Sequence, residues 1–173
     1  LRTGLQGDER LPCAVPVLAQ EEGRQRMIVS FFVPGVPKPQ GSKRAFVVKG
    51  TNRAVVVEAN KNVRDWRTDV RNAATEAMAS KDKERISEGS VMVQLHFVMK
   101  RPLSTPKSKP TPPAVKKPDL DKLERAILDA LTGIVYNDDS QITIMRSKKR
   151  IAEIDEVPGC FITVLSDAHE VEP

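Results

Sequence analysis

One segment in the middle of the chain excludes both kinds of regular secondary structure. Residues 100–118 contain six prolines, six lysine or arginine residues and no acidic residue. Because proline fixes φ and lacks a backbone N–H, this density of prolines prevents a helix or a paired strand. The segment is therefore expected to be an extended or mobile basic arm. It is either a solvated linker or a clamp that orders on a phosphate backbone, and its length inside a compact domain favours a functional role.

Hydrophobic periodicity on both sides of the arm predicts a small α+β domain. Alternating apolar residues indicate strands, whereas apolar spacings of three and four indicate helices, one of which buries Trp66 as a core anchor. The expected elements are, in order, a strand (27–33), a hairpin (45–48 and 54–57), a helix (60–80), a strand (90–99), a helix (122–131) and three strands (134–136, 141–149 and 160–165). This order predicts a mixed β-sheet packed with two helices.

The length of the chain, 173 residues, fits one domain with its own core. Residues 27–165 are expected to form this domain, because Met27 opens the patterned region. Residues 1–26 are expected to be an extension that is flexible or non-native, and residues 166–173 an acidic tail. No apolar run approaches the roughly 20 residues that span a bilayer, and the first 26 residues do not resemble a secretory signal. A cytoplasmic protein is therefore expected.

Basic residues are concentrated in the folded region. Residues 27–152 contain 24 basic and 13 acidic residues, a net charge of +11, whereas residues 153–173 contain six acidic residues and no lysine or arginine. A basic body of this kind either serves solubility alone or indicates a polyanionic partner, for which nucleic acid is the first candidate. The two cysteines and two histidines of the chain do not have metal-ligand spacing.

Two pairs of aspartates stand out against this basic background. Asp119 and Asp121 follow a proline, and in an extended segment both carboxylates lie on one side. Asp138 and Asp139 follow the second helix in a turn, and the two pairs can meet if that helix folds back on the sheet. Carboxylates gathered in this way suit Mg²⁺, which activates water and stabilises the attacking and leaving oxygens of a phosphodiester.

The same aspartates also have simpler interpretations. Asp121 and Glu124 fit a capping box with Asp121 as the N-cap, and Asp138 with Ser140 fits ordinary turn chemistry. Neighbouring bases favour the metal site, because they would hold a phosphate backbone and neutralise developing charge. These bases are Lys116, Lys117, Lys122, Arg125, Arg146, Lys148, Lys149 and Arg150.

The two acidic pairs belong to a longer pattern. Its members are Pro118-Asp119-Leu120-Asp121-Lys122-Leu123, Arg125-Ala126, Asp129-Ala130-Leu131-Thr132-Gly133, Asp138-Asp139-Ser140-Gln141 and Lys149. This pattern resembles the RusA family of Holliday junction resolvases, small endodeoxyribonucleases of bacteria and their phages. The resemblance extends over about residues 27–165, and it includes the basic loop around Lys43 and Arg44.

The resemblance implies a homodimer that binds four-way DNA junctions, in which each subunit nicks one strand with Mg²⁺. Asp119, Asp121 and Asp139 would be the metal ligands. Together with Arg125 and Lys149 they would form the catalytic set, which hydrolyses DNA with a metal-activated water. The expected DNA-binding residues are Lys43, Arg44, Lys116, Lys117, Lys122, Arg146 and Lys148.

Two departures from the family pattern leave other functions open. Arg125 stands where the family usually has a catalytic lysine, and Lys122 stands where it often has asparagine. The chain is therefore either an active resolvase or a junction-binding or duplex-binding protein with weakened catalysis. A third hypothesis is a nuclease of the same fold that acts on branched DNA in general. A phage or prophage gene acting in the bacterial cytoplasm would fit the resemblance.

Overall fold

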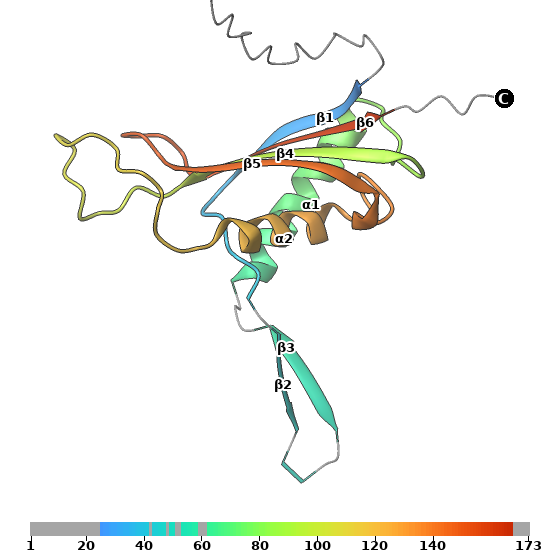
Figure 1. Ribbon diagram of the computed structural model, residues 1–173, viewed down its shortest axis with the longest axis horizontal. Coiled ribbons are helices and arrows are strands. Elements are labelled where there is room, and N and C mark those ends of the chain that lie inside the picture. Colours follow the sequence, from blue (N-terminus) through green and yellow to red (C-terminus); the bar gives the residue numbers. More distant parts are fainter. Residues whose placement is uncertain (1–24, 42, 48, 51–52, 59–61, 168–173) are drawn as a thin grey trace, which may run out of the picture.

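The central sheet is built from four strands whose residues alternately face the helices and face away from them. The computed structural model describes residues 25–41, 43–47, 49–50, 53–58 and 62–167. Within these, β1 (Gln25–Pro34), β4 (Ser90–Met99), β5 (Ile142–Ile151) and β6 (Gly159–Asp167) lie in the order β1-β6-β4-β5 (Figure 1). β6 pairs antiparallel with β1 and with β4, whereas β4 pairs parallel with β5. The predicted mixed sheet is confirmed.

Two helices, α1 (Val63–Ser80) and α2 (Leu120–Leu131), lie on the same side of this sheet (Figure 1). Their apolar residues recur at the spacings that the sequence predicts, and Trp66 is only 3% exposed. The buried residues of the two helices are Val63, Trp66, Val70, Ala74, Ala77 and Met78 in α1, and Leu123, Ala126, Ile127, Ala130 and Leu131 in α2. The predicted α+β domain with two helices is therefore confirmed. No helix among the described residues is long and apolar enough to cross a bilayer.

Parallel pairing of β4 with β5 requires a long crossover, because the chain must return to the end of the sheet where β4 began. Residues 100–141 make this crossover. They leave the end of β4 as the proline-rich arm, return along the sheet as α2, and enter β5 through the short 3₁₀ helix η1 (Asp139–Gln141). α2 consequently runs in the opposite direction to β5, and each end of the helix lies near one end of that strand.

The predicted hairpin forms a separate antiparallel pair, β2 (Lys43–Val47) and β3 (Ala54–Glu58). Figure 1 shows it extending away from the sheet on the side of the helices. Lys43 and Arg44 belong to β2, but their side chains lie outside the described part of the chain.

Residues 133–135 form a turn and Tyr136 makes only isolated β-bridges, so the prediction of a strand at 134–136 is wrong. Gly133 follows α2 with a φ of 80°, a conformation that glycine adopts without steric strain. Tyr136 then folds back, and its hydroxyl donates a hydrogen bond of 3.2 Å to the carbonyl oxygen of Leu128. Apolar residues here pack under the end of the helix, which produces the same local pattern as a short strand.

The first and the last strand along the chain extend beyond their predicted limits. β1 begins at Gln25 and β6 ends at Asp167, so each strand takes residues from the expected extension or tail. The remainder of these terminal segments, 1–24 and 168–173, lies outside the described residues.

The proline-rich arm has no helix or strand, as predicted, but it is folded rather than extended. The guanidinium group of Arg101 donates hydrogen bonds to Thr111 Oγ1 at 2.8 Å and to the carbonyl oxygens of Lys109 and Pro106 at 2.8 and 3.2 Å. One arginine thus holds the two sides of the arm together. The arm loops out beyond the end of the sheet (Figure 1).

The packing of α2 is open to a direct test. Leu123 is fully buried, whereas Leu103 in the arm is 95% exposed. Leu123→Ala should reduce the free energy of unfolding by about 2–5 kcal/mol, the usual effect of emptying a buried leucine site, and Leu103→Ala should leave it within about 0.5 kcal/mol of the wild type. Urea unfolding of the two variants measures this difference. Equal stability of the two variants would contradict the assigned position of α2.

Candidate functional site

The first acidic turn lies where the arm enters α2. Asp119 is the N-cap of this helix and has extended backbone, whereas Asp121 is already inside the first helical turn. The interpretation of Asp121 as the N-cap of a capping box with Glu124 is therefore wrong. Glu124 instead contacts the hydroxyl of Ser147 in β5. Both aspartate side chains are exposed to solvent, so they are accessible to a ligand.

Lys122 forms an ion pair with Asp119. Its ammonium group lies 2.9 Å from Asp119 Oδ2, one helical turn away. The hydrogen bond and the charge of Lys122 hold the pKa of Asp119 below its usual value, with smaller effects from Lys117 and Lys149. The same pair raises the pKa of Lys122. Asp119 therefore stays ionised, and its carboxylate oxygens can act as metal ligands. A cation that binds Asp119 would have to displace the ammonium group of Lys122 from it.

Lys149 supports the backbone of this turn. Its ammonium group donates hydrogen bonds to the carbonyl oxygens of Pro118 at 2.7 Å and Lys116 at 3.1 Å. These contacts hold the end of the arm, and therefore Asp119, against the end of β5. The predicted catalytic Lys149 is thus close to the first acidic turn, with its ammonium group engaged by backbone.

Arg125 lies on the exposed face of α2, one turn after Asp121. Residues four apart on a helix share one face, so the guanidinium and the carboxylate project from the same side. Neither side chain has a hydrogen bond or ion pair with another described residue, and both are available to a ligand.

The second acidic turn has one aspartate engaged in structure. Asp138 is the N-cap of η1: its Oδ1 accepts a hydrogen bond of 2.9 Å from the backbone N–H of Ser140. Gln141 completes a capping box, because its Oε1 accepts from the backbone N–H of Asp138 at 3.1 Å. The interpretation of Asp138 as a turn residue is confirmed, and Asp139 is the member of the pair without this capping role.

The two acidic turns lie at opposite ends of α2. The helix contains 12 residues, which is a length of about 18 Å at the usual rise per residue. β5 gives a second measure, because Ile142 follows the second turn and Lys149 touches the first, and seven strand steps span about 23 Å. Among the described residues, no three His, Cys, Asp or Glu side chains are close enough to share a metal ion. A single chain therefore does not bring Asp139 together with Asp119 and Asp121.

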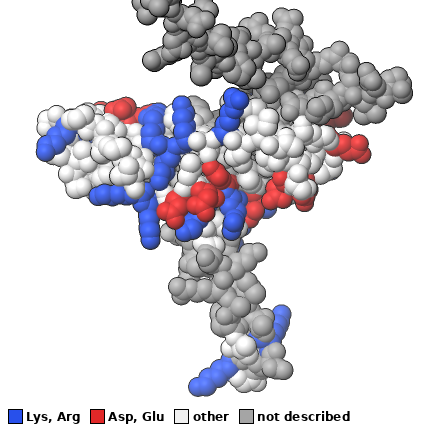
Figure 2. All heavy atoms as spheres, viewed as in Figure 1, with Lys and Arg blue, Asp and Glu red and all other residues white. Residues whose placement is uncertain are grey.

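The predicted DNA-binding residues divide between two faces of the sheet. Ser147 and Lys149 of β5 contact the helix side, so the alternating residues Arg146 and Lys148 face the opposite side. There they line a pocket of about 360 Å³ that also includes His96 and Phe161. Lys116, Lys117 and Lys122 lie at the first acidic turn. Figure 2 shows basic and acidic side chains gathered side by side on one face of the molecule.

The pocket at Asp119 adds a residue that the sequence interpretation left out. This pocket has a volume of about 440 Å³, and Lys38, Lys117 and Lys122 line it together with Asp119. The backbone N–H of Gln40 donates to the carbonyl oxygen of Lys122 at 2.9 Å, which fixes the loop carrying Lys38 beside α2. The signal in the sequence was the pair of prolines around Lys38, which resembles the composition of the arm.

A small α+β domain with exposed carboxylates surrounded by lysines has the features of an enzyme that cuts nucleic acid. A family model described as endodeoxyribonuclease RusA matches residues 34–164. The chain belongs to the RusA family of endodeoxyribonucleases, and membership implies an enzyme that resolves Holliday junctions. No curated protein matches the chain.

Variants of Lys149 and of its neighbour Lys148 test whether Lys149 holds the first acidic turn in place. Lys149→Gln should loosen residues 116–119, because the glutamine amide is shorter than lysine and its uncharged N–H groups make weaker hydrogen bonds to the two carbonyl oxygens, and DNA nicking should fall at least about tenfold. Lys148→Gln on the other face should not change amide hydrogen exchange in residues 116–119. Hydrogen exchange followed by mass spectrometry measures both variants. Unchanged exchange at residues 116–119 in Lys149→Gln would show that the lysine does not hold this turn.

Proposed function

We propose that this chain is a Mg²⁺-dependent endonuclease that resolves four-way DNA junctions by paired nicks and acts as a homodimer. Membership of the RusA family supports DNA cleavage at Holliday junctions. The observation that carries the metal assignment is the exposed pair Asp119 and Asp121 at the start of α2, flanked by Lys116, Lys117 and Lys122. The biological setting that fits this activity is DNA recombination and repair.

The donor set at the first turn fits a hard divalent cation. Mg²⁺ takes oxygen ligands, uses one or two carboxylates, and leaves other positions to water and to substrate phosphate. Asp119 and Asp121 supply two such carboxylates, and Asp119 stays ionised because Lys122 holds its pKa low. When bound, the cation would activate water and stabilise charge on the phosphate being cut.

The residues around the carboxylates have separate roles in this proposal. Lys116, Lys117 and Lys122 hold the phosphate backbone by charge. Arg125, on the exposed face of α2, stabilises the negative charge that develops on the reacting phosphate. Lys149 keeps the turn that carries Asp119 in place through its two backbone carbonyl contacts.

Geometry supports a site completed by a second chain. Asp139 lies about 18 Å of helix away from Asp119 and Asp121 within one chain, which is far beyond the reach of one cation. A two-fold axis that sets two α2 helices antiparallel would place the first turn of one chain beside the second turn of its partner. Each dimer would then hold two identical sites, as paired nicks require.

A second candidate function is a junction-binding protein with weak or no cleavage. The ion pair of Lys122 with Asp119 favours it, because the lysine already neutralises a proposed metal ligand. The two candidates differ in DNA cleavage. The junction-binding protein would bind four-way junctions at low salt but would not cleave them with Mg²⁺.

Nicking of a labelled four-way junction distinguishes these candidates. Wild-type protein should introduce paired nicks in opposite arms with Mg²⁺ and none with EDTA, and should leave a linear duplex of the same sequence intact. Asp121→Asn should bind the junction at least as well, because a negative charge near phosphate is removed, while nicking falls at least about 1,000-fold. Asp82→Asn is the matched control, since Asp82 is an exposed residue outside the site. Cleavage by Asp121→Asn at the wild-type rate would exclude the metal assignment.

Complementation tests whether two chains share a site. Asp121→Asn and Asp139→Asn proteins are each expected to be inactive. Mixed dimers made by co-expression should recover single-strand nicking, because one of the two shared sites then receives Asp121 from one chain and Asp139 from the other. If each site came from one chain, both sites of the mixed dimer would be defective. A mixture without activity would therefore exclude the shared site.

A further inference from the structure

A second pocket adjoins the pocket that contains Asp119. It has a volume of about 370 Å³ and lies between the folded arm and the ends of β4 and β5. The two pockets share Val36, Met99 and Lys117 in their walls. A DNA strand whose phosphate lies at Asp119 would therefore pass the mouth of this arm pocket.

The walls of the arm pocket combine flat apolar surfaces with positive charge. Prolines of the arm line it together with residues at the ends of the two strands, and its larger apolar residues are Val36, Met99, Pro102, Pro112, Pro113 and Ile151. Lys100, Lys116, Lys117 and Lys149 also line the pocket, and none of its described lining residues is acidic. A nucleotide has matching chemistry, since its base has apolar faces and its phosphate is negative. The volume is in the range that holds a small organic ligand.

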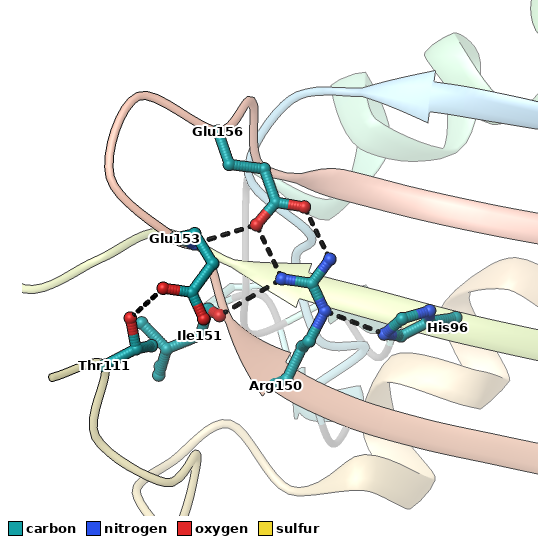
Figure 3. A network of polar contacts seen from close by, with 6 residues as sticks. All are labelled: His96, Thr111, Arg150, Ile151, Glu153 and Glu156. Carbon is teal, nitrogen blue, oxygen red and sulfur yellow. Dashed lines mark hydrogen bonds and ion pairs between the residues drawn. The ribbon is translucent and has the colours of Figure 1, made fainter.

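The outer wall of the pocket is organised before any ligand binds. Arg101 holds the two sides of the arm through Thr111 and two carbonyl oxygens. Thr111 in turn contacts Glu153 in the loop between β5 and β6, as Figure 3 shows. Such prior ordering reduces the entropy lost on binding.

The same network continues to the rim of the sheet. Glu156 accepts a hydrogen bond of 2.8 Å from the backbone N–H of Glu153 and one of 2.6 Å from Arg150 (Figure 3). The Arg150 pair lowers the pKa of Glu156 to about 2, so this anchor of the loop remains ionised at neutral pH. Arg150 lies in β5 and also donates a hydrogen bond of 3.1 Å to His96 Nε2 of β4, so the arm is connected to two strands of the sheet.

We propose that the arm pocket binds one unstacked base of the DNA strand that is cut, from a nucleotide next to the phosphate at Asp119. This inference rests on the proposed nuclease function. A base at a branch point loses a stacking neighbour more easily than a base inside a duplex, so a pocket for such a base selects branched DNA. The prolines and Met99 contact the faces of the base, and Lys100, Lys116 and Lys117 hold the adjoining phosphates.

The experiment uses a four-way junction that carries 2-aminopurine, a base whose fluorescence rises when it is unstacked. The probe is placed in turn at each position next to the branch point, with the full chain at saturating concentration in EDTA so that no strand is cut. Gel retardation establishes that the junction is bound. Wild-type protein should raise the emission at one position near the branch and not in a linear duplex.

Neighbouring residues of the arm provide matched variants. Ala114 lines the pocket, whereas Val115 does not and is 82% exposed. Ala114→Phe should fill the pocket, abolish the rise in emission and weaken junction binding by about 5- to 150-fold, the range for loss of one stacked base. Val115→Phe should behave as the wild type. Ser104→Phe fills the same pocket from another turn of the arm, and thermal unfolding of all three variants shows whether the fold is kept.

Each outcome bears on a different part of the inference. A rise that Ala114→Phe and Ser104→Phe remove and Val115→Phe retains supports the pocket. A bound and nicked junction without any rise in emission overturns the pocket as a base site and leaves the nuclease function intact. The pocket is also overturned if 2-aminopurine emission rises equally in the wild type, Ala114→Phe and Ser104→Phe. Failure to bind any junction overturns the proposed function and the pocket together.

Discussion

The packing of α2 against the sheet determines where the three proposed metal ligands lie. Leu123, Ala126 and Ile127 are fully buried, so the helix cannot turn or slide without exposing core. Its length then separates the acidic turns, with Asp119 and Asp121 at one end and Asp139 beyond the other. A site that uses all three carboxylates consequently depends on a second chain. The burial that stabilises α2 is therefore also the reason why the proposed site calls for a dimer.

Alternation along β5 has a comparable effect on the basic residues. Side chains of a strand point in turn to opposite faces, so the run from Arg146 to Lys149 does not form one patch. Lys149 reaches the carbonyl oxygens behind Asp119, whereas Arg146 and Lys148 face the side of the sheet without helices. Positive charge is therefore available on two surfaces. Under the proposed function, DNA that reaches Asp119 would meet the arm and the start of α2, and a further segment of DNA would meet the other face.

Much of the fold could be predicted, because its strongest signals are local. The alternation in β4, the helical spacing around Trp66 and the glycine that ends α2 each depend on a few neighbouring residues, and the structure has all three. The strand expected at residues 134–136 was wrong because the apolar residues of a turn packed under a helix have the same pattern as a short strand. The folding of the arm around Arg101 was also not predictable, since Arg101, Pro106, Lys109 and Thr111 must first be brought together by the chain.

The sequence by itself determined the chemistry of this protein: a basic body, two acidic pairs and a motif order that places it among the RusA endodeoxyribonucleases. These are properties of residue type and spacing, which need no coordinates. Only the tertiary structure decided which groups meet. In the folded chain Lys122 forms an ion pair with Asp119, and Asp138 caps η1. Lys149 donates hydrogen bonds to the backbone of the first acidic turn, and the arm folds to form the arm pocket. The physical reason is that such contacts join residues distant in sequence or select one rotamer among several, and the packing of the whole domain settles both.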